Sequence, residues 1–509
     1  MHISYHPLFE MVQEAVNATT QAMRDTPHYD LIVIGGGPAG QGAAEFAAFA
    51  GKHTLVIERK VLGGLVVTTG GGPTKTLREA ALHLTGFRYR ALYGLTEQPD
   101  IGMAVARTRA RTREVSSAMQ NFTNSVFVDK LGVDVVDGSA SLGPNRTVIV
   151  TPREGSETEL VFSAQKILIA TGSHAFHPTN IQFDDPDIFD SEGLPKLTRV
   201  PNSVLVIGGG SIGCEFASIF TAFGIPVTVV QSGEHLLSTM DSELSRLLCK
   251  VFENQGMKIV LGTKVRGAGR VNGELQVMLE TDEVLRPDIV LFATGRTVNT
   301  EGLGLDAAGV KLNAQGMIQV DSHFQTSVEG IYAAGDVIGP SLASVSMEQG
   351  RVAACHALGL GFKEKLDPLS VSAVYSVPEL AGVGLTEDNA KEQGILYEVG
   401  RCNFGEIPRG LISGDSDGIL KLIFSRHDRR LLGVHILGDI ASELIALGQA
   451  TLHNSGTIDV FNNLTFATPT YTMAYKYAAF DGFKHLAASG GLPTSGSEQK
   501  GDPVESLQT

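Results

Sequence analysis

The sequence predicts an α/β fold that contains two similar units. Each unit consists of a short aliphatic run, a loop with three glycines, a helical stretch and a second aliphatic run. Continuous apolar runs of this length are typical of strands that are buried on both faces of a parallel sheet. The glycine content supports this interpretation, because the 59 glycines gather in short loops rather than in low-complexity segments.

The first unit lies near the start of the chain. Its strand, helix and second strand are expected at residues 31–34, 39–50 and 54–57. In the connecting loop, GGGPAG, Gly35 permits a tight turn, Gly37 lets the backbone approach a pyrophosphate, and Gly40 lets the helix pack against the strand. Glu58 ends the second strand, where an acid can accept hydrogen bonds from the adenosine ribose hydroxyls. The residues predicted to hold a dinucleotide are Gly35, Gly37, Pro38, Ala39, Gly40 and Glu58.

The second unit repeats this order. Its strand, helix and second strand are expected at 204–207, around 215–220 and at 227–230. The loop reads GGGSIG, and the predicted contacts are Gly208, Gly210, Ser211, Ile212, Gly213 and Gln231. Two complete copies of the pattern of strand, glycine loop, helix and strand suggest that the chain binds two dinucleotides. Flavin and nicotinamide are the usual couple, because each can pass a hydride to the other.

The two units end in residues of different charge. An acid such as Glu58 favours an unmodified ribose 2′-hydroxyl and repels a 2′-phosphate, whereas Gln231 is neutral and can hydrogen-bond to either group. No arginine follows Gln231 at once, and Glu234 opposes a dedicated NADP site. We therefore expect a site that tolerates both NAD and NADP.

Composition excludes several classes of function. Acidic residues outnumber basic ones, 55 against 40, so a nucleic acid is not expected as a partner. The apolar stretch at 31–51 contains the first glycine loop, and residues 1–28 carry acids, so we expect neither a membrane span nor a signal peptide. The cysteines form no local pair and no clustered metal site, which favours a reducing cytoplasm; they are Cys214, Cys249, Cys355 and Cys402.

The two ends of the chain differ from its body. Five apolar residues near the N-terminus recur at helical spacing: Leu8, Met11, Val12, Ala15 and Val16. We expect a short amphipathic extension that docks on the body of the protein or on a partner. Residues 487–509 are rich in Gly, Ser, Pro, Glu and Gln and are expected to form a disordered tail.

With these units placed, residues 29–485 resemble the flavoprotein disulfide reductase family, and within it the branch of soluble pyridine nucleotide transhydrogenases. Further segments match the family in order: KILIATGS at 166–173, DIVLFATGRTVNT at 288–300, GIYAAGDVIG at 330–339 and SLASVSMEQGR at 341–351. Two segments are more specific to the transhydrogenase branch, GSHAFHPT at 172–179 and FATPTYTMAYKYAAFDG at 466–482.

This resemblance implies a domain order and further site residues. The implied segments are an N-terminal extension (1–28), an FAD-binding domain (29–174 and 296–368), an inserted NAD(P)-binding domain (175–295), a C-terminal α+β dimerisation domain (369–486) and the tail (487–509). The flavin would also contact Thr171, Gly172, Asp336 and Ala343, and the nicotinamide nucleotide would contact Gly295. Lys75 would bind the flavin near N5, with Glu215 as its carboxylate partner, and the protein would form a homodimer.

Two motifs of the reductases are missing. Their redox-active cysteines fall at Val66 and Gly71, in GGLVVTTGGGPTK, and their C-terminal histidine and glutamate fall at Thr468 and Met473. A disulfide reductase needs a thiolate beside the flavin and a base for the substrate thiol, and none of these four residues supplies either. Reduction of disulfides or of mercuric ion through thiols is therefore not expected.

The expected function is FAD-dependent hydride transfer between NADPH/NADP and NADH/NAD, by a ping-pong mechanism without a redox disulfide. A cation such as Lys75 stabilises the charge that builds on reduced flavin. Ser211, where some reductases have a tyrosine, would leave the nicotinamide pocket open. Two alternatives remain: a diaphorase that passes electrons to a quinone or another small acceptor, and a non-catalytic or sensor flavoprotein.

Overall fold

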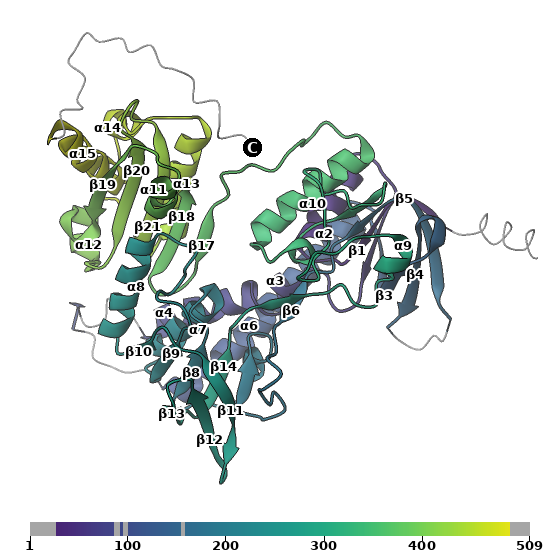
Figure 1. The fold of residues 1–509 in the computed structure, drawn as a ribbon, viewed down its shortest axis with the longest axis horizontal. Coiled ribbons are helices and arrows are strands. Elements are labelled where there is room, and N and C mark those ends of the chain that lie inside the picture. The colour runs from purple at the N-terminus through teal and green to yellow at the C-terminus, as the bar shows by residue number, and fades with distance from the viewer. Residues whose placement is uncertain (1–26, 86–91, 95–99, 154–157, 489–509) are drawn as a thin grey trace, which may run out of the picture. The chain divides into compact units, whose positions relative to one another are not determined.

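The computed structural model describes residues 27–85, 92–94, 100–153 and 158–488 (Figure 1). They form two compact units: the described part of unit 1 lies within 27–73, 114–174 and 296–366, and that of unit 2 lies within 74–113, 175–295 and 367–488. The apolar pattern predicted within residues 1–26 and the tail from 489 onward lie outside the described residues. Within the described part, no helix combines the length and the apolar character needed to cross a bilayer.

Unit 1 is built on a parallel sheet in the order β3–β2–β1–β5–β16. Strand β4 is antiparallel and pairs with the later part of β3 and the first part of β5. The strands are β1 (His28–Ile34), β2 (Thr54–Glu58), β3 (Asp134–Leu142), β4 (Thr147–Pro152), β5 (Leu160–Ile169) and β16 (Ile331–Ala333). The sequence predicted β2 to within one residue and the last four residues of β1, because these are continuous buried runs. Strand β1 begins three residues earlier than predicted, at His28, where exposed and half-buried residues break the apolar run.

Helices α2 (Pro38–Phe49) and α10 (Ala343–Leu358) pack against each other in unit 1. Their approach requires glycine, since a Cβ at Gly350 would stand 1.9 Å from the carbonyl oxygen of Ala39. The other helical segments of this unit are α3 (Gly64–Thr68), η1 (Ser125–Lys130), η2 (Pro144–Arg146), α9 (Leu305–Ala308) and η4 (Asp336–Ile338). The short strands β6 (Ser173–Ala175) and β15 (Arg296–Val298) pair with each other.

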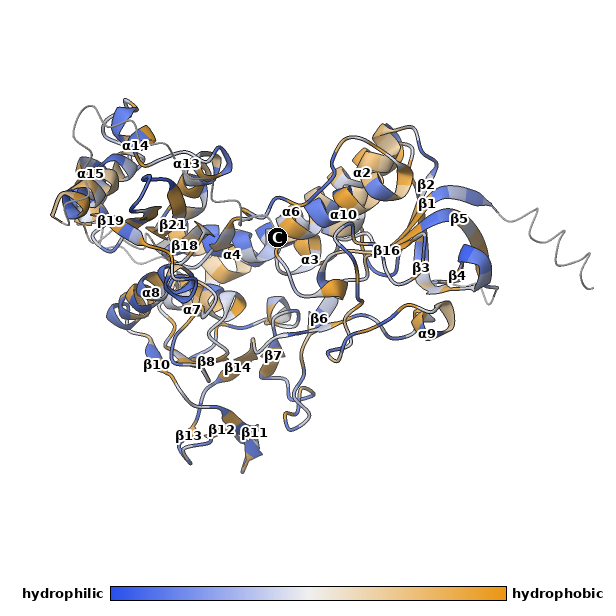
Figure 2. Ribbon diagram, turned by 45° about the horizontal axis from the view of Figure 1, so that its top comes forward, coloured by the Kyte–Doolittle hydropathy of each residue, from blue (hydrophilic) through white to orange (hydrophobic). Residues whose placement is uncertain are grey.

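The nucleotide-binding part of unit 2 has a second parallel sheet, in the order β10–β9–β8–β14–β7. Its strands are β7 (Ile188–Asp190), β8 (Val204–Ile207), β9 (Val227–Val230), β10 (Lys258–Val260) and β14 (Ile289–Phe292). Strands β8 and β9 have the bounds that the sequence predicted. The buried strands β8 and β14 appear as hydrophobic segments in Figure 2.

Further elements complete this part of the chain. An antiparallel sheet contains β11 (Val265–Val271), β12 (Glu274–Leu279) and β13 (Val284–Leu285). The helices are α4 (Gly72–Thr85), η3 (Leu194–Lys196), α7 (Ser211–Ala222) and α8 (Ser242–Asn254). Helix α6 (Ile101–Asn124) begins in unit 2 and ends in unit 1, because unit 2 includes residues up to 113 and unit 1 resumes at 114. Asp241 caps α8, because its side chain accepts the N–H groups of Glu243 and Leu244.

The C-terminal part of unit 2 has the predicted α+β architecture. Its antiparallel sheet has the order β17–β18–β21–β20–β19, and helices α13 and α15 pack on it. The strands are β17 (Ser372–Val374), β18 (Glu379–Gly384), β19 (Tyr397–Asn403), β20 (Ile419–Ser425) and β21 (Leu431–Gly438). The helices are α11 (Glu387–Glu392), η5 (Phe404–Glu406), α12 (Pro408–Ser413), α13 (Ala441–His453), α14 (Asp459–Asn463) and α15 (Met473–Ala488).

Candidate functional site

The two glycine loops have nearly the same backbone geometry. Gly35 and Gly208 have left-handed φ angles of 107° and 106°. A Cβ at Gly35 would stand 2.3 Å from the carbonyl oxygen of Ala170, and a Cβ at Gly208 would stand 2.4 Å from that of Ala293. Both turns therefore require glycine, for the φ angle and for the space.

The other glycines of the loops shape a cradle at each helix N-terminus. A Cβ at Gly40 or Gly213 would stand 2.0 or 1.9 Å from the carbonyl oxygen of the first loop glycine, so these residues allow the helix to pack close to the strand. Gly37 and Gly210 are the N-cap residues of α2 and α7, and a Cβ built on either has no heavy atom within 4 Å. This open space in front of unsatisfied N–H groups fits a pyrophosphate in both units.

The remaining loop residues occupy the first turns of the two helices. Pro38 is the first residue of α2, and Ala39 is buried behind it. Ser211 begins α7 and is exposed, whereas Ile212 is half-buried. The small, exposed side chain of Ser211 leaves the start of this helix open.

Glu58 and Gln231 occupy equivalent places at the ends of β2 and β9. The backbone N–H of Gly36 donates to Glu58 Oε2 at 2.7 Å, and that of Gly209 donates to Gln231 Oε1 at 2.9 Å. The first unit therefore presents a carboxylate at its strand end. The second presents an amide group, which keeps the same backbone contact and adds N–H donors.

Asp336 lies within a small polar network of unit 1. Its carboxylate accepts the hydroxyl of Ser173 and, at 3.1 Å, the N–H of Ser341. The Nε atom of Arg296 lies 3.6 Å from the same carboxylate and donates to the Ser173 hydroxyl at 2.7 Å. Sequence analysis missed Arg296, although it directly follows the predicted Gly295. The signal available in the sequence was a basic residue directly after the segment Ala293–Gly295.

The other predicted residues lie where chain segments meet. Thr171 donates its hydroxyl to the carbonyl of Asn299 at 2.7 Å, and the Asn299 amide donates back to the Thr171 carbonyl at 2.8 Å. Gly172 and Gly295 have positive φ angles of 69° and 144°. Ala343 is exposed and begins α10.

Lys75 and Glu215, predicted as partners, form an ion pair within unit 2. The Nζ atom of Lys75 lies 2.8 Å from Glu215 Oε2, and Glu215 is almost fully buried. The backbone N–H of Tyr375 donates to Glu215 Oε1 at 3.0 Å, and Lys75 lies 4.8 Å from the centre of the Tyr375 ring. Burial raises the pKa of Tyr375, with further contributions from Glu379 and Glu215, so its phenol stays neutral.

A second ion pair supports the same helix. Arg78 lies one turn after Lys75 on α4, and its guanidinium lies 3.0 Å from the carboxylate of Glu379 at the start of β18. Arg78 also donates to the carbonyl of Ser376 at 3.3 Å. Burial raises the pKa of Glu379, while Arg78 acts in the opposite direction. Sequence analysis missed Arg78 and Tyr375, because their partners lie far away in the chain.

The four positions that the resemblance aligns with the reductase motifs are Val66, Gly71, Thr468 and Met473. Val66 lies in α3 and contacts Gly71 closely, because a Cβ at Gly71 would stand 2.4 Å from the Val66 carbonyl oxygen. Thr468 donates its hydroxyl to the sulfur of Met473 at 3.1 Å. Neither pair can carry electrons or accept a proton near neutral pH.

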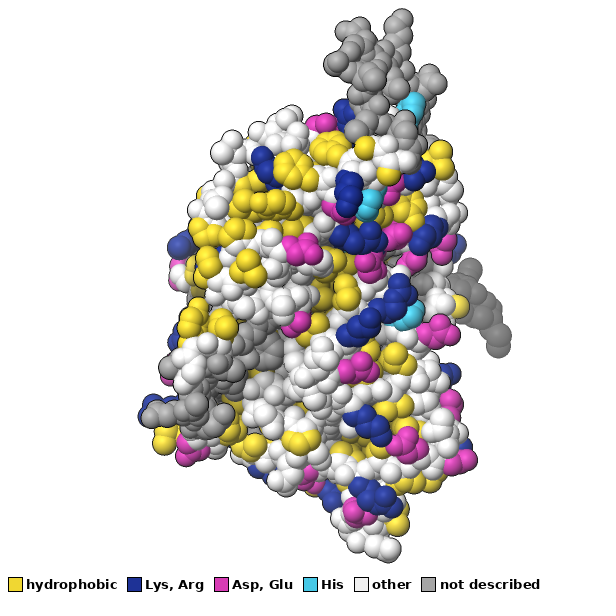
Figure 3. Space-filling view, turned by 90° about the vertical axis from the view of Figure 1, so that its left-hand side faces the viewer, with side chains coloured by type: hydrophobic (Ala, Val, Ile, Leu, Met, Phe, Trp, Pro, Cys, Tyr) yellow, Lys and Arg dark blue, Asp and Glu magenta, His cyan; other side chains and the backbone are white. Residues whose placement is uncertain are grey.

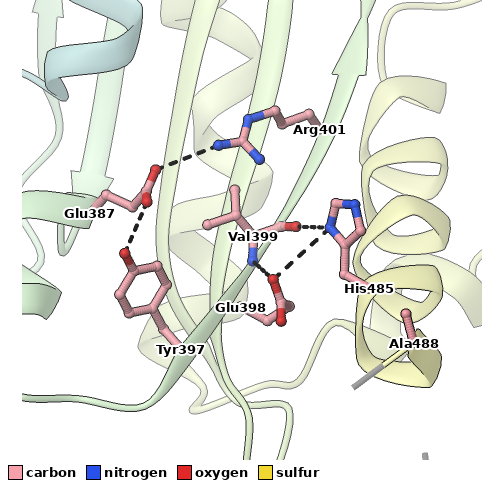
Figure 4. A pocket seen from close by; sticks show the side chains of 7 residues that line it. All are labelled: Glu387, Tyr397, Glu398, Val399, Arg401, His485 and Ala488. Carbon is pink, nitrogen blue, oxygen red and sulfur yellow. Dashed lines mark hydrogen bonds and ion pairs between the residues drawn. The ribbon is translucent and has the colours of Figure 1, made fainter. Parts of the chain in front are cut away.

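A pocket of about 610 Å³ in the C-terminal part of unit 2 is unrelated to these residues (Figure 4). Its polar groups bind each other: the Tyr397 hydroxyl donates to Glu387 at 2.9 Å, and Arg401 lies 3.5 Å from Glu387. Beneath it, the fully buried Lys421 pairs with Glu387 at 2.7 Å and with Asp241 at 3.0 Å. This network joins β20 to α8 and α11.

A smaller cavity of about 470 Å³ lies in unit 1. One of the residues that line it, Lys60, follows Glu58 by two positions in the chain. Its charged lining residues are Lys60, Asp129, Asp137 and Arg153. Among the residues that the structure describes, no group of three or more His, Cys, Asp or Glu could hold a metal ion.

Comparisons with known proteins agree with this architecture. The family described as pyridine nucleotide-disulphide oxidoreductase matches residues 29–350, and its dimerisation domain matches residues 370–479. The soluble pyridine nucleotide transhydrogenase of Mycobacterium bovis (strain BCG / Pasteur 1173P2) is 37% identical over 462 residues, which cover 90% of this chain and 98% of the relative. That of Pseudomonas entomophila (strain L48) is 35% identical over 464 residues, covering 90% and 99%.

Solved structures show the same fold. LpdA from Mycobacterium tuberculosis has a TM-score of 0.81 at 27% identity, covering 89% of this chain and 99% of its own. The Cu(II) complex of the HOCl-induced flavoprotein disulfide reductase RclA from Escherichia coli has a TM-score of 0.80 at 27% identity, with the same coverage. This chain therefore belongs to the pyridine nucleotide-disulphide oxidoreductase family and is an oxidoreductase that uses FAD and NAD(P).

Proposed function

We propose that the protein transfers hydride between NADPH/NADP and NADH/NAD through FAD, without a redox disulfide. The relatives named soluble pyridine nucleotide transhydrogenases support a reaction between two nicotinamide nucleotides. The observation that carries the proposal is a contrast within one chain. Both dinucleotide loops are complete, whereas the resemblance aligns Val66 and Gly71 with the thiols of the reductases. Electrons taken from one nucleotide then have no thiol route outward.

We infer that one nicotinamide pocket serves both nucleotides in turn, as a ping-pong mechanism requires. FAD supplies a flavin that accepts a hydride from one nicotinamide and gives it to the next. The small side chain of Ser211 supports exchange of the nucleotides, because it does not cover the start of α7. Gln231 can hydrogen-bond to a 2′-hydroxyl or a 2′-phosphate without repelling either. Lys75, held by Glu215, would stabilise the negative charge of the reduced flavin.

We further infer a homodimer formed through the C-terminal domain. This domain matches a dimerisation domain and exposes large apolar side chains, among them Leu464, Tyr477 and Phe480. Figure 3 views the molecule from the side of α15 in Figure 1 and shows hydrophobic side chains gathered in its upper part. Light scattering should give twice the 54.0 kDa chain mass. The four free cysteine thiols are compatible with a protein that functions in a reducing cytoplasm.

The decisive experiment is anaerobic hydride transfer from NADPH to thio-NAD⁺ by the purified FAD-loaded protein, measured beside NADPH with a quinone. We expect thio-NADH to form faster than the quinone is reduced. A flavin that is reduced quickly but passes electrons only to the quinone would show a diaphorase. If neither nucleotide bleaches the flavin, the protein is a non-catalytic flavoprotein.

A further inference from the structure

Tyr375 lies where three elements of unit 2 meet. It directly follows β17, and its backbone N–H donates to Glu215 of α7 at 3.0 Å. The centre of its ring lies 4.8 Å from the Nζ atom of Lys75 on α4. One tyrosine therefore contacts both members of the Lys75–Glu215 ion pair, the carboxylate through its backbone and the ammonium through its ring.

The chain that carries Tyr375 is itself fixed to α4. The next residue, Ser376, is fully buried, and its carbonyl accepts a hydrogen bond from Arg78 at 3.3 Å. The Ser376 hydroxyl donates to the carbonyl of Pro378 at 2.7 Å. Glu379, which is also buried, pairs with Arg78 at 3.0 Å. The backbone on both sides of the tyrosine is thus held by buried polar contacts, so its ring has a defined place beside Lys75.

A lysine side chain gains from such a neighbour, because its four-carbon stem is flexible. The face of an aromatic ring attracts an ammonium within about 6 Å of the ring centre, and the attraction strengthens as the cation loses water. The side chain of Lys75 is only 32% exposed. The Tyr375 ring and the Glu215 carboxylate therefore both restrict where the ammonium lies.

The ring holds the ammonium without adding a negative charge. Burial raises the pKa of Tyr375, with further contributions from Glu379 and Glu215, so its phenol is neutral near pH 7. A second carboxylate in its place would give Lys75 and its partners a net negative charge. Such a charge would oppose the negative charge that builds on a reduced flavin, whereas a neutral ring does not.

We propose that Tyr375 is a positioning residue for Lys75, because its ring keeps the ammonium in the orientation that stabilises the reduced flavin. The proposal rests on the proposed function, in which Lys75 has this electrostatic role. Tyr375 acts only through Lys75. A segment at the start of the C-terminal domain therefore sets the position of a side chain on α4.

The midpoint potential of the flavin in the FAD-loaded protein tests this proposal, and the rate of flavin reduction by NADPH is a second readout. Tyr375→Leu removes the ring; it should lower the potential and slow the reduction about 2- to 30-fold, the size of a cation–π attraction. Tyr375→Phe keeps the ring and should stay within about twofold of the unmodified protein. Tyr93→Leu, at a 60% exposed tyrosine of unit 2, is the matched control and should change neither readout. Absorbance of bound FAD verifies folding of each variant.

A double-mutant cycle shows whether Tyr375 acts through Lys75. Because Lys75→Met removes the ammonium, adding Tyr375→Leu to it should cause no further loss of potential or rate. Losses that add would assign Tyr375 a separate structural role and overturn the proposal. An unchanged potential and rate in Tyr375→Leu would also overturn it. So would an equal loss in Tyr375→Phe, since the effect would then belong to the hydroxyl.

These outcomes can be distinguished from failure of the proposed function. The potential is measured against a reference dye during reduction that needs no nicotinamide nucleotide, so it can be obtained for a diaphorase or a non-catalytic flavoprotein too. Failure of hydride transfer to thio-NAD⁺ would reject the transhydrogenase reaction and leave the coupling between Tyr375 and Lys75 measurable. An unchanged potential in Lys75→Met would instead overturn the role of Lys75 and this proposal with it.

Discussion

Lys75 and Glu215 form an ion pair, 2.8 Å long, that connects α4 to α7 in unit 2. The pair has a defined geometry, because the second carboxylate oxygen of Glu215 accepts the backbone N–H of Tyr375 at 3.0 Å. Arg78, one turn along α4, adds an ion pair with Glu379 at 3.0 Å. The helix that carries Lys75 is therefore fixed at two points, as the electrostatic role proposed for Lys75 requires.

Replacing Lys75 by methionine should slow reduction of the flavin by NADPH. A fixed cation near developing negative charge is worth about 10²–10³ in rate, and we expect a loss of this size with FAD still bound. Anaerobic stopped-flow absorbance measures the rate, and a redox titration should show a lower flavin potential. Lys250→Met, at an exposed lysine of α8, is the control. An unchanged rate and potential would mean that Lys75 has only a structural role.

Replacing Gln231 by glutamate should select against NADPH. Glu58 shows that a carboxylate fits this position of the fold, because it accepts the equivalent backbone N–H. A carboxylate facing a 2′-phosphate should cost about 1–3 kcal/mol, so KM for NADPH should rise about fivefold to 150-fold, with KM for NADH little changed. Steady-state kinetics with each nucleotide measures this. Glu253→Gln, at an exposed glutamate of α8, should leave the preference unaltered. An equal rise in KM for both nucleotides would contradict a contact with the 2′-group.

Introducing cysteines at positions 66 and 71 should not create a disulfide reductase. A Cβ at Gly71 would stand 2.4 Å from the carbonyl oxygen of Val66, so Gly71→Cys overpacks the loop and should cost about 1–3 kcal/mol of stability. We expect the double variant Val66→Cys/Gly71→Cys to have a lower Tm and no activity on lipoamide or glutathione. Gly70→Cys is the matched control, since a Cβ there meets no atom within 4 Å. Robust disulfide reduction by the double variant would refute this prediction.

Acidification should destabilise the C-terminal part of unit 2 through His435. Burial lowers the pKa of this histidine, although Asp241 and Glu387 oppose the shift, and Lys421 adds to it. The folded state therefore binds the His435 proton more weakly than the unfolded chain does. The stabilisation is present above the ordinary pKa of 6.5 and decreases as pH falls below it.

Differential scanning calorimetry between pH about 7 and about 5 measures this loss as a falling Tm. His435→Asn should flatten the dependence, whereas His427→Asn, at an exposed histidine, should not. A Tm that stays constant over this range in the unmodified protein would exclude the effect. A second loss is expected at lower pH, where the pKa of Glu387 is lowered to about 2, chiefly by Lys421 against the opposing effect of burial.

The elements near the glycine loops could be predicted from sequence because their determinants are local. Strands β8 and β9 are continuous apolar runs, and both occupy the predicted residues. Positions 35 and 208 require glycine, because each has a positive φ angle and a carbonyl oxygen close to where a Cβ would stand. Glycine at both positions could be predicted from the G-x-G-x-x-G spacing. The pairing of Lys75 with Glu215 was predicted from resemblance to a family, and the structure contains it.

The sequence by itself determined the two glycine loops and the strand–helix–strand order of the units that contain them. Only the tertiary structure decided which groups hold the predicted residues in place. Tyr375 reaches Glu215 across 160 residues of chain, and Arg78 reaches Ser376 across 298. A sequence pattern reports on neighbours within a turn or along a strand. Contacts over such separations arise when whole elements pack, so their residues carry no local signal.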